Sequence, residues 1–301
     1  MTSTAKTDFE QKAAAWMGWL RVCGRSPKTI ATYYAALLSL DRFLQSRGSV
    51  AVSRIKLCDL EAWQLVLLKN ECTPSTREQF ARTVSYWFGW LKQQGLIFSN
   101  PAVALKKPKL PRLLGRCPTE AQMAKICRGL AGRRPRVLRD RALLEIAYST
   151  GARREEVTRL RVDSVNLQLG LIRLHGKGDR ERMVPLTRLA VLACARYLGG
   201  ARAQLLGRRT DHGALFISER SGTPLGYAGV GAVIASAGRR AGIKITMQEI
   251  RRAFATHLFR GGAHITPIKE LLGHVSYRHL RHYLVLPADR LALQRKLKST
   301  P

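Results

Sequence analysis

Acidic residues are scarce in this chain. Its 301 residues include 20 Asp and Glu against 52 Lys and Arg, so the formal net charge is +32. A chain that repels itself this strongly predicts a polyanionic partner, with nucleic acid as the first candidate and an acidic membrane surface as the second. An arginine-rich composition from a GC-rich genome would explain the excess of Arg but not the shortage of acids. Apolar residues make up 46% of the chain, which excludes a disordered basic tail.

Long apolar runs are also absent. No window approaches 18 consecutive apolar residues, and residues 1–10 are polar without an apolar centre, so neither a membrane span nor a secretory signal is predicted. The six cysteines are scattered and form no C-x-x-C pair. In a chain of this length that pattern is typical of reduced, structural thiols in a cytoplasmic protein.

The motifs of several enzyme classes are missing. There is no G-x-x-x-x-G-K-[ST] loop, so chemistry driven by nucleoside triphosphates is not supported. The chain also contains no G-x-S-x-G elbow and no H-E-x-x-H helix. Three histidines cluster near the C-terminus, at His274, His279 and His282, but their spacing matches no standard metal site. We therefore expect no metal and no cofactor.

The first 105 residues predict a helical domain. Ser26-Pro27 combines an N-cap with proline at the first helical position, and apolar residues then recur at helical spacing until Gly48. Further helices are predicted in three places: up to Gly24, over 59–70, and from Thr73 to Gly95. Residues 1–105 are thus expected to form a small helical bundle.

A basic segment follows this bundle. Residues 106–118 contain three prolines and five basic residues, which predicts an extended linker and a domain boundary. Thr119 then has Gln122 three residues later, the signature of a capping box at the start of a helix.

Residues 119–301 show a mixed pattern and are expected to form the second domain. The predicted elements are helices over 137–149 and 155–160, a β-hairpin over 170–186, a short third strand at 214–218, and a helix that starts within 226–231. The fold class predicted for the chain is mainly α, with a small sheet in an α+β second domain.

The second domain contains the groups that attack on a phosphodiester needs. The transition state gains charge on the nonbridging oxygens, which calls for several Arg or His donors. A tyrosine phenoxide is a feasible nucleophile if cations lower its pKa, and a lysine on a hairpin turn suits protonation of the leaving oxygen.

With these groups, the sequence resembles the tyrosine recombinases, which are also called the phage integrase family. Five boxes occur in the order and spacing of that family: residues 150–156 (TGARREE), 176–178 (GKG), 248–251 (QEIR), 271–274 (LLGH), and a tyrosine nine residues after the last box. The resemblance covers nearly the whole chain. It implies a helical N-terminal core-binding domain and a C-terminal catalytic domain with a tail.

The resemblance also implies a set of site residues. The expected catalytic residues are Arg153, Lys177, Gln248, Arg251, His274 and Tyr283. Glu156 is expected to support them. The arginines, His274 and Gln248 would bind the scissile phosphate, Lys177 would be the general acid, and Tyr283 would be the nucleophile. The family usually has His where this chain has Gln248, and Gln cannot carry a proton. His257 lies in an apolar stretch, where we expect a structural role.

Each of these residues also has a simpler interpretation. Arg153 could pair with Glu155 or Glu156 on the surface, and Lys177 could be an exposed turn residue. Tyr283 could be a half-buried helix aromatic, with Tyr277 as a rival nucleophile. The joint occurrence of five boxes favours the family interpretation over these separate ones.

The function implied is site-specific DNA recombination through a 3′-phosphotyrosine intermediate. The expected partner is double-stranded DNA. A homotetramer would bind two paired sites, and the protein would be a monomer or dimer in the absence of DNA. An accessory protein is a possible further partner. The localisation implied is cytoplasmic and nucleoid-associated, with no membrane contact. Residues 289–298 are expected to dock onto a neighbouring subunit. Because the core-binding pattern starts near residue 8, we expect no arm-binding domain. The chain then resembles a simple recombinase, which is either Xer-like or carried by a transposon or plasmid.

Two other functions stay open on the sequence alone. One is a DNA-binding accessory relative that has weak activity or none, as the Gln248 change could indicate. The other is a strand-passing enzyme of the type IB topoisomerase kind, which uses similar chemistry.

Overall fold

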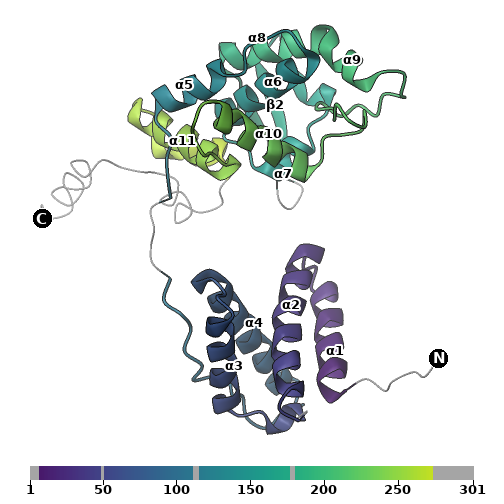
Figure 1. The fold of residues 1–301 in the computed structure, drawn as a ribbon, viewed down its shortest axis with the longest axis vertical. Coiled ribbons are helices and arrows are strands. Elements are labelled where there is room, and N and C mark those ends of the chain that lie inside the picture. The colour runs from purple at the N-terminus through teal and green to yellow at the C-terminus, as the bar shows by residue number, and fades with distance from the viewer. Residues whose placement is uncertain (1–6, 49–50, 111–114, 177–179, 274–301) are drawn as a thin grey trace, which may run out of the picture. The chain divides into compact units, whose positions relative to one another are not determined.

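The structure of the protein is a computed structural model that describes residues 7–48, 51–110, 115–176 and 180–273. The chain divides into two compact units, Met1–Arg112 and Leu113–Pro301. Each unit is described by itself below (Figure 1). Within the described residues, no helix has both the length and the apolar character needed to cross a membrane.

The N-terminal unit is a bundle of helices, as the sequence predicts. Its elements are α1 (Asp8–Val22), α2 (Pro27–Gln45), a single 3-10 turn η1 (Val52–Arg54), α3 (Leu57–Lys69) and α4 (Pro74–Gln93). The side chains of Thr7, Ser26 and Thr73 cap three of these helices by accepting a backbone N–H from the first turn. Three tryptophans with almost no exposed surface, Trp16, Trp63 and Trp87, fill the core.

The C-terminal unit begins with the predicted capping box. Thr119 accepts from the backbone N–H of Gln122, and the Gln122 side chain accepts from that of Thr119, so helix α5 (Glu120–Arg128) starts there. Residues 106–110 and 115–118, the described parts of the predicted linker, form neither helix nor strand.

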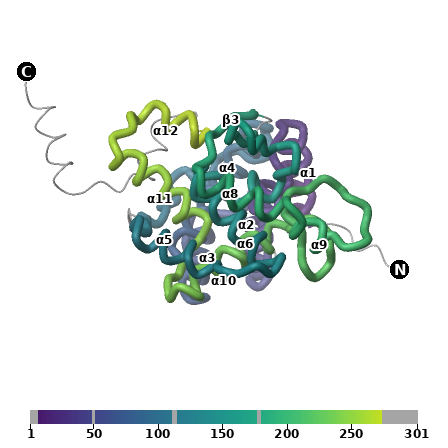
Figure 2. The backbone as a smooth tube through the Cα atoms, turned by 90° about the horizontal axis from the view of Figure 1, so that it is seen from above, coloured from purple at the N-terminus to yellow at the C-terminus, as the bar shows by residue number. Residues whose placement is uncertain are grey.

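Helix α6 (Pro135–Thr150) runs through the middle of this unit, and its side chains are buried nearly all round. The remaining elements are α7 (Arg154–Thr158), η2 (Val162–Ser164), β1 (Val165–Asn166), β2 (Leu171–His175), β3 (Glu181–Pro185), α8 (Arg188–Arg196), η3 (Tyr197–Ala201), α9 (Arg202–Leu206), α10 (Tyr227–Arg240), α11 (Met247–Arg260) and α12 (Ile265–Leu271). Gly226 precedes α10, which confirms the predicted helix start. Figure 2 shows α11 and α12 next to each other at one edge, with β3 beside α12.

The sheet is antiparallel and has the strand order β1-β2-β3. The predicted hairpin is confirmed as β2 and β3, in which Leu174 pairs with Arg182. The predicted third strand at 214–218 is wrong, because the third strand is Val165–Asn166. Residues 214–218 make only isolated bridges, since Leu215 donates to the carbonyl of Leu160 on one side while Phe216 and Ser218 bond with 223–225 on the other.

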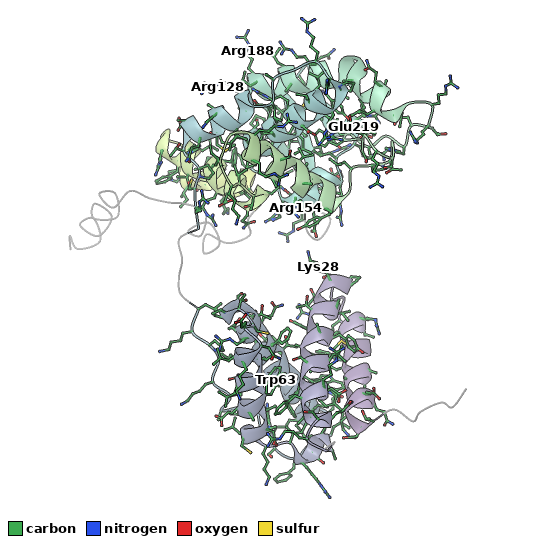
Figure 3. The ribbon with its side chains drawn as sticks, viewed as in Figure 1. Lys28, Trp63, Arg128, Arg154, Arg188 and Glu219 are labelled. Atoms are coloured by element: carbon green, nitrogen blue, oxygen red, sulfur yellow. The ribbon has the colours of Figure 1, made fainter. Side chains whose placement is uncertain are left out.

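Arginines are spread over the surface of the C-terminal unit. Figure 3 shows Arg128 of α5 and Arg188 of α8 on the side opposite to Arg154 of α7. The excess positive charge is therefore not confined to one face of this unit.

Candidate active site

The first arginine box forms the turn between α6 and α7. Gly151 ends α6 in the left-handed region, with φ of 59°, and a side chain there would collide with the ring of Phe254. Thr150 Oγ1 accepts from the backbone N–H of Ala152, at 3.2 Å. This tight turn places Arg153 at the start of α7, with its side chain 37% exposed.

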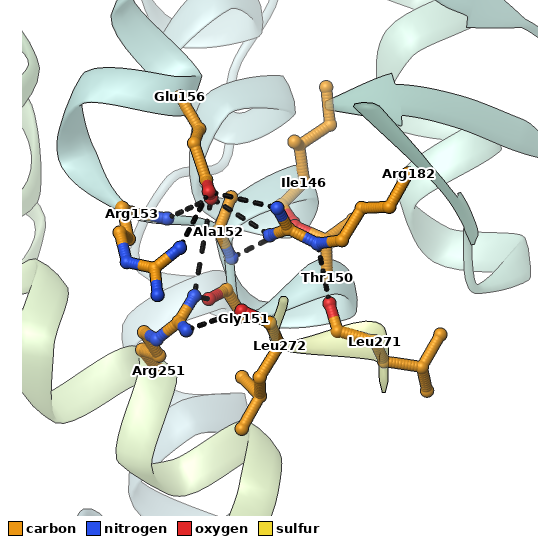
Figure 4. A network of polar contacts seen from close by, with 10 residues as sticks. All are labelled: Ile146, Thr150, Gly151, Ala152, Arg153, Glu156, Arg182, Arg251, Leu271 and Leu272. Carbon is orange, nitrogen blue, oxygen red and sulfur yellow. Dashed lines mark hydrogen bonds and ion pairs between the residues drawn. The ribbon is translucent and has the colours of Figure 1, made fainter. Parts of the chain in front are cut away.

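Glu156 lies at the centre of a polar network that joins this turn to the sheet and to α11 (Figure 4). Its carboxylate accepts from the backbone N–H and the Nη1 of Arg153, at 2.7 and 2.9 Å. It also accepts from both Nη atoms of Arg182, each at 2.9 Å, and lies 4.0 Å from Nη1 of Arg251. Glu156 itself is only 3% exposed. One buried carboxylate thus faces three arginines from three elements.

The electrostatics of this network keep Glu156 ionised. Burial would by itself raise the pKa of Glu156, but the hydrogen bonds and charge of Arg182, the Arg153 backbone and Arg251 outweigh it and hold the pKa below the usual 4.5. The charged form is therefore the one that the folded protein favours.

Arg251 is held by backbone carbonyls that are distant in the sequence. Its Nη1 donates to the carbonyl of Gly151 at 2.7 Å and its Nη2 to that of Leu272 at 2.6 Å. The side chain is 1% exposed. These bonds bring together the first arginine box, α11 and the segment that leads to His274.

Gln248 lies in the first turn of α11, three residues before Arg251, and is exposed. Residues three apart on a helix are neighbours, so Gln248 and Arg251 belong to the same side of α11. Thr246 caps this helix and forms a capping box with Glu249. The positive end of the α11 dipole therefore lies beside Gln248, an arrangement that favours an anion.

Three of the predicted catalytic residues, Lys177, His274 and Tyr283, lie outside the described residues. The neighbours that precede two of them are described. Gly176 comes directly before Lys177, and Gly273 directly before His274. The predicted tail at 289–298 and the rival Tyr277 also lie outside the described part.

Arg182 is a site residue that was not predicted from the sequence. Its position on β3 has the same parity as buried Val184, so it lies on the inward face of the hairpin. A charged residue at an inward position of a strand needs a buried partner. That alternation was a usable signal, but only tertiary structure identifies Glu156 as the partner.

Two tyrosines and two buried cysteines of the C-terminal unit are poor candidates for a nucleophile. Burial raises the pKa of Tyr148 and Tyr197 to about 12, as it does for the thiols of Cys127 and Cys194, so none of these four is a ready nucleophile. Tyr148 Oη lies 2.8 Å from Nδ1 of His257, the histidine for which a structural role is predicted. No group of three or more His, Cys, Asp or Glu among the described residues could hold a metal ion.

Comparisons with known proteins agree with this arrangement. Residues 118–289 match the phage integrase family. The chain is 32% identical to tyrosine recombinase XerC of Herpetosiphon aurantiacus, over 94% of this chain and 92% of that protein. It is 30% identical to tyrosine recombinase XerD of Shewanella oneidensis, over 89% of each.

Solved structures share the fold. The Tn1549 transposon integrase, in complex with circular intermediate DNA, aligns with a TM-score of 0.73 at 17% identity and covers 97% of this chain and 99% of that one. A lambda integrase dimer bound to a COC′ core site aligns with a TM-score of 0.72 at 18% identity, covering 91% and 94%.

Proposed function

Because this chain belongs to the phage integrase family and is a DNA strand-transferring enzyme that carries out site-specific recombination, we propose that Tyr283 is its nucleophile. Its hydroxyl proton passes to water, the phenoxide oxygen attacks the scissile phosphorus, the bond from phosphorus to the 5′ oxygen breaks, and a 3′-phosphotyrosine forms. Lys177 gives a proton to the departing 5′ oxygen. Attack by the 5′ hydroxyl of a second strand reverses these changes and releases Tyr283.

Arg153 and Arg251 bind the nonbridging oxygens of that phosphate, and Gln248 and His274 add hydrogen bonds. The observation that carries this proposal is the network around Glu156. The carboxylate holds Arg153 by two hydrogen bonds and lies 4.0 Å from Arg251. Preorganised donors stabilise developing charge because they need no reorganisation during the reaction.

The cluster also has the charge that a phosphate needs. Three arginines face one carboxylate, so the cluster retains a positive excess. Arg153 is the most exposed of the three, which suits it to contact substrate, whereas Arg251 is rigidly held by two carbonyls. Glu156 and the peptide carbonyls therefore position Arg153 and Arg251, and these two arginines bind the phosphate.

The protein binds DNA, and the net charge of +32 supports broad contact with phosphates beyond the scissile one. We propose that four protomers act on two paired sites. A lambda integrase tetramer bound to a Holliday junction has the same fold, with a TM-score of 0.70 at 18% identity, and supports this assembly.

The test uses a nicked DNA substrate whose short 5′ fragment diffuses away after cleavage and traps the covalent adduct. Wild-type protein should form an adduct that resists denaturation, and Tyr283→Phe should form none. Tyr277→Phe is the matched control, because it removes the neighbouring phenol and should keep the adduct. An adduct that persists in Tyr283→Phe but disappears in Tyr277→Phe would assign the nucleophile to Tyr277.

The same preparation separates the alternative functions. A DNA-binding accessory relative would give no adduct with wild-type protein. An enzyme of the type IB topoisomerase kind would relax supercoiled plasmid without a specific site, whereas a recombinase should exchange strands only between two paired sites.

A further inference from the structure

Arg182 is engaged by two separate segments of the C-terminal unit. Both of its Nη atoms donate to Glu156, at 2.9 Å each, and its Nε donates to the carbonyl of Leu271 at 2.7 Å. The side chain is 12% exposed. One guanidinium on β3 therefore ties the hairpin to α7 on one side and to the end of α12 on the other (Figure 4).

Two glycines pack directly on this pair. A Cβ on Gly176 would lie 3.7 Å from both Nη1 of Arg182 and Oε1 of Glu156. A Cβ on Gly273, which has φ of 63°, would lie 3.1 Å from Nη1 of Arg182. Gly176 is joined to Lys177, and Gly273 to His274. The residues that directly precede two proposed catalytic side chains thus both lie next to the Arg182–Glu156 ion pair.

The hairpin turn is closed at its base close to that pair. The backbone N–H of Gly176 donates to the carbonyl of Arg180 at 2.7 Å, two residues before Arg182. The turn lies between the end of β2 at His175 and the start of β3 at Glu181. Strand β2 also packs against α7 directly, and Arg182 adds the polar link from β3 to the carboxylate of Glu156. This side chain therefore helps to fix the distance from the hairpin to the arginine box.

We propose that Arg182 is a positioning residue for the general acid. Arg182 holds the hairpin at the distance from which Lys177 reaches the 5′ oxygen. This inference rests on the proposed function. An arginine is required because its planar fork bonds both oxygens of Glu156 while Nε remains for Leu271, and an ammonium cannot make that set of bonds. Displacement of a catalytic group by about 1 Å costs on the order of 10²-fold in rate.

The experiment compares two nicked substrates that differ in the leaving atom. One carries the ordinary 5′ oxygen and the other a bridging 5′ sulfur. A thiolate leaves without protonation, because a thiol has a far lower pKa than an alcohol, so the sulfur substrate does not need the general acid. The quantity measured is the rate of adduct formation on sulfur divided by that on oxygen, at saturating DNA.

Lys177→Ala should raise this ratio by about 10²-fold or more, the usual contribution of a general acid. Arg182→Gln should raise it by at least about 10-fold, since the acid is present but misplaced. Arg182→Lys should give an intermediate ratio. A loss common to both substrates that accompanies the rise in the ratio would report the contact with Leu271 and the segment before His274.

The matched control is Arg173→Gln. Arg173 lies on the neighbouring strand, opposite Met183, on the outward face of the same hairpin. It should keep the wild-type ratio. A melting curve shows whether each variant is folded, and the milder Arg182→Lys keeps the test valid if Arg182→Gln is not.

The outcomes are distinct. If Arg182→Gln and Arg182→Lys slow both substrates by the same factor, Arg182 supports the fold alone and the inference is overturned. If wild-type protein forms no adduct on either substrate, the proposed function fails instead. If Lys177→Ala leaves the ratio unchanged, the general acid is another group, and the inference that Arg182 positions Lys177 for that role is overturned.

Discussion

Replacing Glu156 by Gln tests the physical reasoning about the site most directly. The change keeps the volume and one carbonyl oxygen of the side chain but removes its charge. Arg182 and Arg251, 12% and 1% exposed, would then lose the carboxylate that compensates them. Removing one partner of a buried ion pair leaves an uncompensated buried charge, which is the costly case.

The size of the effect follows from these contacts. Breaking a buried pair in this way costs about 3–5 kcal/mol, and the remaining amide oxygen places Glu156→Gln near the lower end. The contact with Arg153, whose side chain is 37% exposed, adds little because solvent screens it. A domain of 150–250 residues loses about 2–4 °C in Tm per kcal/mol, so the C-terminal unit should melt about 6–12 °C lower.

The chain provides its own internal reference for this assay. All five tryptophans lie within the first 90 residues, in the N-terminal unit. Tryptophan fluorescence therefore follows the N-terminal unit, and circular dichroism follows both. In Glu156→Gln the dichroism transition of the C-terminal unit should shift while the fluorescence transition stays.

Glu155→Gln, at the adjacent and exposed position, is the control. It should shift neither transition by more than about 1 °C, because surface substitutions usually change stability very little. A shift below about 2 °C in Glu156→Gln would refute the view that Glu156 compensates buried arginines.

Acid titration gives a second test of the same carboxylate. The pKa of Glu156 in the folded protein lies below its usual 4.5, so the ionised group stabilises the fold at pH values above 4.5. This stabilisation is lost as the pH falls below 4.5 through the folded pKa. Glu156→Gln should lack that part of the acid dependence when stability is measured at several pH values.

Three further changes are expected to have defined results. Gly151→Ala should lower the free energy of unfolding in urea by about 1–3 kcal/mol, because the new methyl group would collide with Phe254. Gly242→Ala is the control and should lower it by less, because φ there is 70° but the surrounding space is open. Burial lowers the pKa of His257 below its usual 6.5, so stability should fall as the pH drops below 6.5, and His257→Gln should reduce this fall. Gln248→His should keep or raise the cleavage rate, by up to about 10²-fold, and a fall of more than about 10-fold would mean that the box is misaligned.

Local order in this protein could be predicted from the sequence because it depends on neighbouring residues. Helix starts at Ser26, Thr73 and Thr119 follow from side chains that cap their own first turn. The hairpin likewise follows from alternation around a glycine-containing turn. The strand expected at 214–218 was wrong, because its backbone partners lie on two different sides and no local pattern reports them.

The sequence by itself determined the family boxes and indicated a polyanionic partner, and it predicts the residue types of the reaction. Only the tertiary structure decided how the boxes are joined. Arg251 meets the carbonyl of Gly151 across 100 residues, and Arg182 meets Glu156 across 26. Such contacts leave no periodic trace in the sequence, because a buried charge needs a partner but not at any fixed spacing. A buried charge without a partner would destabilise the folded chain, so the fold is stable only when these residues are in contact.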